Sequence, residues 1–292
     1  MDRMDNIGEN EIRVIGRNEQ PQTKPGKKNW LMPAVLVAVA AVVAAILWLA
    51  KETQTGSQVD NSVEVVYNNA TDSTVENPAY VEITDTIINN VSLHRFIPIN
   101  ARPKLEVGVI KDIPPQYILG AMAADFGLIN DKYQVIGAFV YHGQMLSHSK
   151  SKYGFCALLK DTLVIGNDLS TSFFEQTVEE GGDFFRQYAL VHQGEVVSNP
   201  PTHNDALRRS LCRLNDGRVC VIDTDMSVSL DSFSTALHLY GVRDAVALMG
   251  SGAAVRWAVD QAGRRFIAGA DEYDFPNVVN YIVWEKTDKK DE

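Results

Sequence analysis

An uncharged apolar segment near the amino terminus constrains this chain more than any other feature. Residues 30–50 contain no charged side chain. A helix of this length spans about 30 Å, the hydrocarbon thickness of a bilayer. Trp30 and Trp48 lie near its ends, where amphipathic rings favour the headgroup region. Pro33 falls in the first turn, where its missing N–H costs little. The segment therefore predicts one transmembrane helix over 30–50, and a buried core helix is the alternative interpretation.

The charges that flank this segment predict its orientation. Lys24, Lys27 and Lys28 precede it, whereas Lys51 is offset by Glu52. Because excess Lys and Arg stay in the cytoplasm, we expect an inner-membrane, single-pass protein with its N-terminus in the cytoplasm. Its C-terminal part then lies in the periplasm or outside. A cleaved signal peptide is the alternative, but the apolar core of such a peptide is usually only about 7–15 residues long.

Composition divides the rest of the chain. Residues 1–29 have few large apolar side chains, which predicts a disordered cytoplasmic tail. Residues 51–76 are rich in Thr, Gln, Ser, Asn and Asp, which predicts a flexible linker. Residues 77–292 are expected to form the folded domain. The formal net charge of −10 argues against a nucleic-acid partner, since phosphates require a basic surface. The partner that these features predict is the membrane.

The pattern from residue 77 onward favours strands. Segments in which apolar residues alternate with polar ones or follow one another predict single strands over 80–87, 105–110, 135–141, 245–249 and 278–284. Two strands around a turn are predicted over 157–165, 188–197, 211–222 and 255–268, the last pair being 255–259 and 264–268. Leu230, Phe233, Leu237 and Tyr240 recur at helical spacing after a capping Ser229. These features predict an α+β fold: a β-rich mixed-sheet domain with a few flanking helices, preceded by the transmembrane helix.

Residue types with obvious chemistry are scarce. The histidines show no zinc-ligand spacing, and we expect no metal and no cofactor. Asp223 and Asp225 lie on one side of a strand end, where two carboxylates hold a cation or act as acid and base, although a solvated turn is the simpler interpretation. Cys212 and Cys220 flank the turn at 215–217. A three-residue turn makes them face each other and a two-residue turn does not; in either case we expect free thiols.

The order of several segments resembles the phosphodiester glycosidase domain family, which includes many bacterial envelope proteins. Residues 136–144 resemble a strand and turn of that family, and residues 208–217 resemble its Arg-led strand before an Asp-Gly turn. Residues 228–250 resemble its helix, "Asp-Ala-Leu" strand and Gly-rich loop. The resemblance covers roughly residues 83–283. It implies a glycosidase that cleaves a sugar from a phosphodiester, with Arg208 or Arg209 holding phosphate and Gly250, Ser251 and Gly252 contacting the substrate.

Two motifs depart from the family pattern. Ala123-Ala-Asp-Phe-Gly127 stands where the family has Asn-Ala-Gly, so that Asp125 is the polar group that remains. Met249 stands where the family has an acidic residue, and glycoside cleavage normally uses two carboxyl groups. The sequence therefore leaves two functions open. One is a hydrolase with Asp125, Asp223 or Asp225 as the catalytic acid, and the other is a non-catalytic envelope module that binds glycan or protein.

Overall fold

The computed structural model describes the part of the chain that forms the folded unit. The chain divides into a unit of residues 1–58 and a unit of residues 59–292. The described residues are 63–66, 78–149, 151–160, 162–168, 171–199, 204–269 and 275–287. The tail expected at 1–29 and the helix expected at 30–50 lie outside them. Residues 63–66 form a strand, so four residues of the expected linker belong to a sheet.

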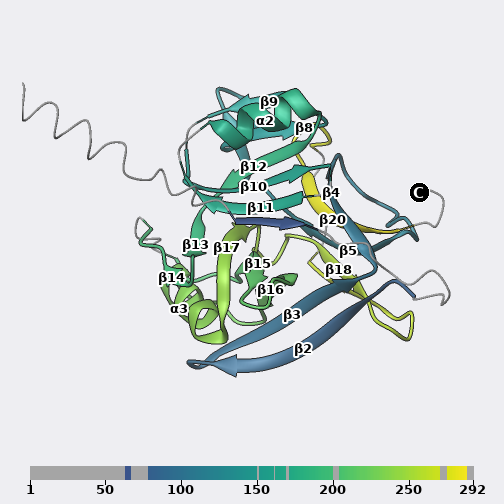
Figure 1. Ribbon diagram of the computed structural model, residues 1–292, viewed down its shortest axis with the longest axis vertical. Helices are drawn as coiled ribbons and strands as arrows, with labels where there is room; N and C mark the ends of the chain where they lie inside the picture. Colours follow the sequence, from purple (N-terminus) through teal and green to yellow (C-terminus); the bar gives the residue numbers. More distant parts are fainter. Residues whose placement is uncertain are drawn as a thin grey trace, which may run out of the picture. The chain divides into compact units, whose positions relative to one another are not determined.

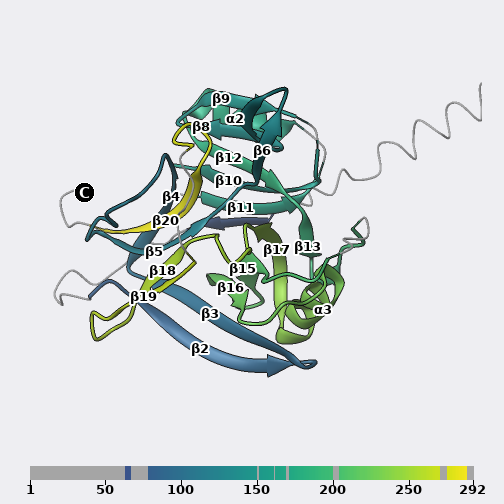
Figure 2. The same cartoon turned by 180° about the vertical axis from the view of Figure 1, so that it is seen from behind.

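Antiparallel strands make up most of the described structure (Figures 1 and 2). The six-stranded sheet has the order β1 (Val63–Val66), β11 (Thr162–Asn167), β10 (Gly154–Leu159), β12 (Asp183–Gln187), β8 (Ala138–Tyr141) and β9 (Gln144–His148). The seven-stranded sheet has the order β14 (Glu195–Val196), β13 (Ala189–His192), β17 (Val242–Leu248), β15 (Arg209–Leu214), β16 (Val219–Thr224), β3 (Val91–Ile99) and β2 (Tyr80–Ile88).

Two smaller sheets and two helices complete the described elements. The five-stranded sheet has the order β19 (Arg265–Ala268), β18 (Arg256–Val259), β5 (Tyr117–Met122), β20 (Asn280–Lys286) and β4 (Ala101–Val107). Strands β6 (Phe126–Ile129) and β7 (Lys132–Val135) pair only with each other. The helices are α2 (Ser172–Glu180) and α3 (Leu230–Tyr240).

The helical part of the predicted fold class requires correction. Strands dominate as expected, but the described residues contain only two helices, of 9 and 11 residues. At about 1.5 Å per residue, such helices are roughly half as long as a bilayer is thick. None of the described helices is long and apolar enough to cross a membrane. For the described residues, the predicted α+β class is therefore replaced by a β-rich fold with two short helices.

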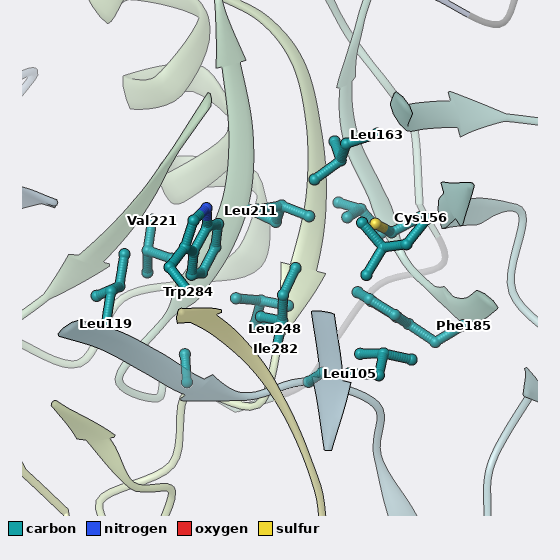
Figure 3. Close-up of a cluster of buried hydrophobic side chains, with 14 of the residues drawn as sticks. Leu105, Leu119, Cys156, Leu163, Phe185, Leu211, Val221, Leu248, Ile282 and Trp284 are labelled. Carbon is teal, nitrogen blue, oxygen red and sulfur yellow. The ribbon is translucent and has the colours of Figure 1, made fainter. Parts of the chain in front are cut away.

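The main core lies where the three large sheets meet. Figure 3 shows Leu211, Val221 and Leu248 of the seven-stranded sheet in one cluster with Ile282 and Trp284 of β20. The same cluster includes buried side chains of the six-stranded sheet, among them those of β10 and β12. The far face of the seven-stranded sheet packs against α3. Because it is covered on both faces, β17 is the buried apolar strand that the sequence predicts.

The hairpin of β15 and β16 fixes the register at the centre of this sheet. Gly217 has φ +88°, as its turn requires. Cys212 lies directly opposite Cys220, which is the facing register. Both thiols are free and buried, as is that of Cys156. Burial raises the pKa of Cys220 well above its ordinary value, and the thiol of Cys212 raises it further. The expectation of three free thiols is confirmed.

Candidate functional site

Four polar residues form a row across the seven-stranded sheet. Asp85 lies opposite His94, His94 opposite Asp223, Asp223 opposite Arg209, and Arg209 opposite Leu248. Residues that lie directly opposite each other in an antiparallel sheet point to the same face. The row therefore lies on the face of the sheet that also carries the main core. It is located at the C-terminal ends of β16 and β17.

Asp223 is the centre of this row. Its carboxylate is 4% exposed. The oxygen Oδ2 accepts a hydrogen bond from Nε of Arg256 at 3.0 Å. It also accepts weaker ones from Nε and Nη2 of Arg209 at 3.4 and 3.5 Å. The other oxygen, Oδ1, is buried and has no hydrogen-bond partner among the described residues. Because a buried carboxylate oxygen normally accepts a hydrogen bond, this atom is suited to a donor on a ligand.

The two arginines differ in how completely the protein satisfies them. Nη1 of Arg209 donates to the carbonyl oxygens of Met249, Ala254 and Val255 at 3.1, 3.1 and 3.3 Å. Burial lowers the pKa of Arg209 to about 10; the charge of Asp223 counteracts this effect and that of Arg256 adds to it. The guanidinium of Arg256 stacks over Phe96 at 4.1 Å, and within the described structure only its Nε donates a hydrogen bond.

His94 links the two exposed carboxylates of the site. Its Nδ1 is 2.6 Å from Oδ1 of Asp85, and its Nε2 is 3.3 Å from Oδ2 of Asp225. Partial burial lowers the pKa of His94. The hydrogen bond to Asp85, the charge of Asp223 and the hydrogen bond to Asp225 outweigh burial, so that the pKa lies above its ordinary value. The arrangement therefore favours a protonated imidazolium between carboxylates.

The loop after β17 packs closely against the start of β15. A Cβ at Gly250 would lie 2.6 Å from the carbonyl oxygen of Leu207 and 2.7 Å from the backbone N of Arg209, so only glycine fits there. A Cβ at Gly252 would meet nothing within 4 Å. The N–H of Ala254 donates to the carbonyl oxygen of Ser251 and closes the turn. The loop is thus held tightly at one end and open at the other.

These groups line one cavity of about 420 Å³. Seven of the eight site residues that the sequence predicts are among its lining residues: Asp223, Asp225, Arg208, Arg209, Gly250, Ser251 and Gly252. The volume is within the range of about 300–1,000 Å³ typical of small-molecule sites. The loop after β17 and the arginines at the start of β15 are therefore neighbours, as expected, although their roles stay predictions.

The eighth residue, Asp125, lies elsewhere. Its carboxylate accepts a hydrogen bond from the buried Nζ of Lys152 at 2.5 Å, and Nζ also donates to Gln187 at 2.7 Å. Burial lowers the pKa of Lys152, while the charge of Asp125 opposes this effect. Asp125 does not line the cavity. In the structure this carboxylate neutralises a buried lysine.

The contacts of Arg208 and Met249, which the motif resemblance singled out, show what these two side chains do in the fold. The side chain of Arg208 donates to the carbonyl oxygens of Val228 at 3.0 Å and Asn204 at 2.7 Å, so it fastens the segment before β15 to the segment before α3. Met249 packs against an apolar cluster that includes Met122 and Trp257, and its side chain does not line the cavity. Of the two arginines that the sequence proposed for phosphate, neither has its whole guanidinium available.

Three ionisable residues of the cavity were missed by sequence reasoning: Asp85, His94 and Arg256. A signal existed for Asp85, because it lies two residues after Ile83 in a predicted strand and therefore on the same face. Arg256 begins a segment that was predicted as a strand, where a buried charge is unusual. His94 lies in β3, which was not predicted, so nothing in the sequence brought it toward Asp223.

Comparisons with known proteins support the fold. No protein-family model matches the chain, and no curated protein matches it in sequence. The fold resembles the catalytic domain of zebrafish N-acetylglucosamine-1-phosphodiester alpha-N-acetylglucosaminidase, solved in a form auto-inhibited by its pro-peptide. The TM-score is 0.53 at 13% identity, over 77% of this chain and 88% of that one. A hypothetical protein from Synechocystis gives a TM-score of 0.49 at 10% identity, over 72% and 64% of the two chains.

The first of these similarities defines the class of fold. At 13% identity it shows a distant fold relation to the phosphodiester glycosidase catalytic domain and no more. Of the family relation that the motifs predict, only this distant relation of fold is shown.

Proposed function

We propose that this domain binds a sugar phosphate or a sugar phosphodiester, of the kind carried by cell-envelope glycans, in the cavity beside Asp223. One observation carries the proposal. Two buried guanidinium groups, of Arg209 and Arg256, share a single carboxylate oxygen. A buried charge without a partner is costly, so an anion in this cavity completes the balance.

The phosphate of the ligand would lie against Arg256 and the loop 250–252. The terminal Nη groups of Arg256 make no hydrogen bond to a described residue, and a planar guanidinium matches phosphate oxygens with two parallel donors. Among the described residues, the N–H groups of Ser251 and Gly252 donate to no backbone carbonyl. Such N–H groups, together with the open space at Gly252, suit an approaching oxyanion.

The sugar would be recognised by the unpaired carboxylate oxygen. Oδ1 of Asp223 is an acceptor without a donor, and a sugar hydroxyl is a donor of the right size. Asp225 adds a second acceptor at the rim, where its side chain is 57% exposed. A phosphate donor set and hydroxyl acceptors thus occur in one cavity. The zebrafish enzyme with the similar fold is named for a sugar phosphodiester, which agrees with this ligand class.

Binding without hydrolysis is the preferred form of the proposal. Glycoside cleavage normally needs one carboxyl group that is protonated and a second that is ionised. The carboxylate of Asp223 is held in ion pairs with two guanidinium groups. Met249 offers no acid. Hydrolysis is kept as a second candidate because of His94, whose raised pKa and position beside Asp225 suit a general acid.

Calorimetric titration of the purified chain tests the proposal. We expect glucose 1-phosphate to bind and glucose, which lacks the phosphate, to bind at least tenfold more weakly. The Arg256→Met variant should lose about 10- to 100-fold in affinity, since hydrogen bonds to charged groups contribute about 1.5–3 kcal/mol. Asp223 keeps Arg209 as a partner in this variant, so the fold is expected to persist.

Arg218 provides the matched control. It lies in the turn between β15 and β16, its side chain is 48% exposed and it pairs with Asp216. Arg218 does not line the cavity, so Arg218→Met removes the same charge outside it and should leave the affinity unchanged. Equal affinity for glucose and glucose 1-phosphate, or an equal loss in both variants, would contradict the proposal. Release of glucose from a glucose 1-phosphate diester that His94→Gln abolishes would support hydrolysis instead.

A further inference from the structure

Part of the cavity lining is apolar. The charged row crosses β2, β3, β16 and β15. The lining also includes Ile83 of β2, Phe96 of β3 and Phe266 of β19. Phe96 is already covered by the guanidinium of Arg256. Ile83 is half-buried, and Phe266 remains 42% exposed. The phosphate and hydroxyl contacts proposed above use none of this apolar surface.

The register of β18 and β19 locates Phe266 relative to the proposed phosphate site. Arg256 lies opposite Ala268. Phe266 is two residues earlier in β19, so it points to the same face as Ala268, about 7 Å along the strand. A group attached to a phosphate at Arg256 therefore needs to extend only a few bonds to reach the ring of Phe266.

Ile83 approaches the same region from the opposite sheet. It lies opposite Phe96 and two residues before Asp85, so it shares their face. Strand β18 contacts β2, which brings the hairpin of β18 and β19 next to Ile83. Single exposed apolar side chains are common on protein surfaces. Here an exposed aromatic ring and an aliphatic side chain line one cavity beside an anion site.

We propose that the preferred ligand is a phosphodiester whose second alcohol is apolar, with its alkyl chain between Ile83 and Phe266. This inference rests on the proposed function, because it assumes that the phosphate binds at Arg256. It adds the identity of the second alcohol that is esterified to this phosphate. Charge complementarity orients the ligand: the ionic end meets the guanidinium of Arg256, and the hydrocarbon end meets the side chains of Ile83 and Phe266.

Two diesters of glucose 1-phosphate, one with methanol and one with octanol, test the inference in the full chain. They carry the same charge and the same sugar and differ only in the alkyl group. Each fully buried methylene tightens binding about fourfold. Burial of only two methylenes therefore makes the octyl diester bind more than tenfold tighter than the methyl diester. Phe266→Ser should reduce this ratio to below about threefold and leave the affinity for the methyl diester unchanged.

Ile87→Ser is the matched control variant. Ile87 lies in β2, is 73% exposed and does not line the cavity. This variant should keep the full ratio of octyl to methyl affinity. Equal binding of the two diesters to the wild-type chain would overturn the inference, as would an unchanged ratio in Phe266→Ser.

The same titrations separate the two proposals. If glucose 1-phosphate and the methyl diester bind but the octyl chain adds nothing, only the apolar subsite is wrong. If neither binds, the proposed function fails and the inference fails with it. Octyl glucoside, which has the chain but no phosphate, should bind at least tenfold more weakly than the octyl diester. Equal affinity for these two octyl compounds would overturn the proposed function.

Discussion

Replacement of Asp223 by asparagine tests the charge balance on which the site depends. The substitution keeps the shape of the side chain and removes the only carboxylate that contacts both Arg209 and Arg256 within the described structure. All three residues are at most 9% exposed. Two guanidinium groups then lie buried without a counter-charge.

The magnitude follows from the contacts. Breaking a buried ion pair by removing one partner typically costs about 3–5 kcal/mol. Arg209 retains its three carbonyl acceptors, and Arg256 retains the face of Phe96. These contacts compensate part of the lost charge, so we expect the lower end of the range, about 3 kcal/mol. Asp225→Asn is the control. The side chain of Asp225 is 57% exposed and pairs with His94, and exposed ion pairs of this kind contribute about 0–1 kcal/mol.

Urea denaturation of the two variants and the wild-type chain, followed by circular dichroism, measures the difference in the free energy of unfolding. If Asp223→Asn lost less than about 1 kcal/mol, or no more than Asp225→Asn, the two arginines would not depend on this carboxylate. The argument for an anion site would then lose its basis. Phosphate in the buffer should recover part of the stability of Asp223→Asn, because an anion that binds only the folded chain stabilises it.

Two further predictions concern pH and the loop after β17. The raised pKa of His94 means that its links to the carboxylates stabilise the fold fully below about pH 6.5 and are lost as the pH rises through the higher folded-state pKa. The difference in unfolding free energy between wild type and His94→Gln should therefore decrease as the pH rises above about 6.5. A difference that does not change with pH would show that protonated His94 does not stabilise the fold through these carboxylates. Gly250→Ala places a Cβ within 2.7 Å of two backbone atoms and should weaken glucose 1-phosphate binding through displacement of the loop. Gly252→Ala, whose Cβ meets nothing within 4 Å, should keep the fold and stability, and equal stability of the two variants would contradict this packing argument.

The parts of the fold that the sequence predicts are those with a strong local signal. The turn at Gly217 and the apolar run of β17 are local, and the structure confirms the hairpin and the buried strand. Helix α3 begins after Ser229, whose hydroxyl accepts the N–H of Ser232, and ends at Gly241 with φ +91°. In each case a few neighbouring residues determine the conformation.

The missed elements lack such local signals. Strand β5 is buried along its whole length, so it shows no alternation and is hard to distinguish from a helix segment. Strand β3 contains a proline, Pro98, which favours a non-strand interpretation. Because β3 joins β2 to β16, the row from Asp85 to Asp223 could not be constructed without it. The cavity therefore became visible only with the pairing of strands distant in sequence.

The cavity contains carboxylates although Met249 stands where the resembled motif has an acidic residue, and the position of Met249 explains why. Leu248 lies opposite Arg209 and shares the face of the charged row, whereas the next side chain, that of Met249, packs against Trp257 and its neighbours. The backbone carbonyl of Met249 still accepts a hydrogen bond from Arg209. The carboxylates of the cavity come from other strands, β2 and β16, and the central one is neutralised by two guanidinium groups. A site built in this way retains the charges that attract and orient an anion, whereas the thioether of Met249 can donate no proton. This arrangement is the physical reason to expect affinity for a sugar phosphodiester with little or no turnover.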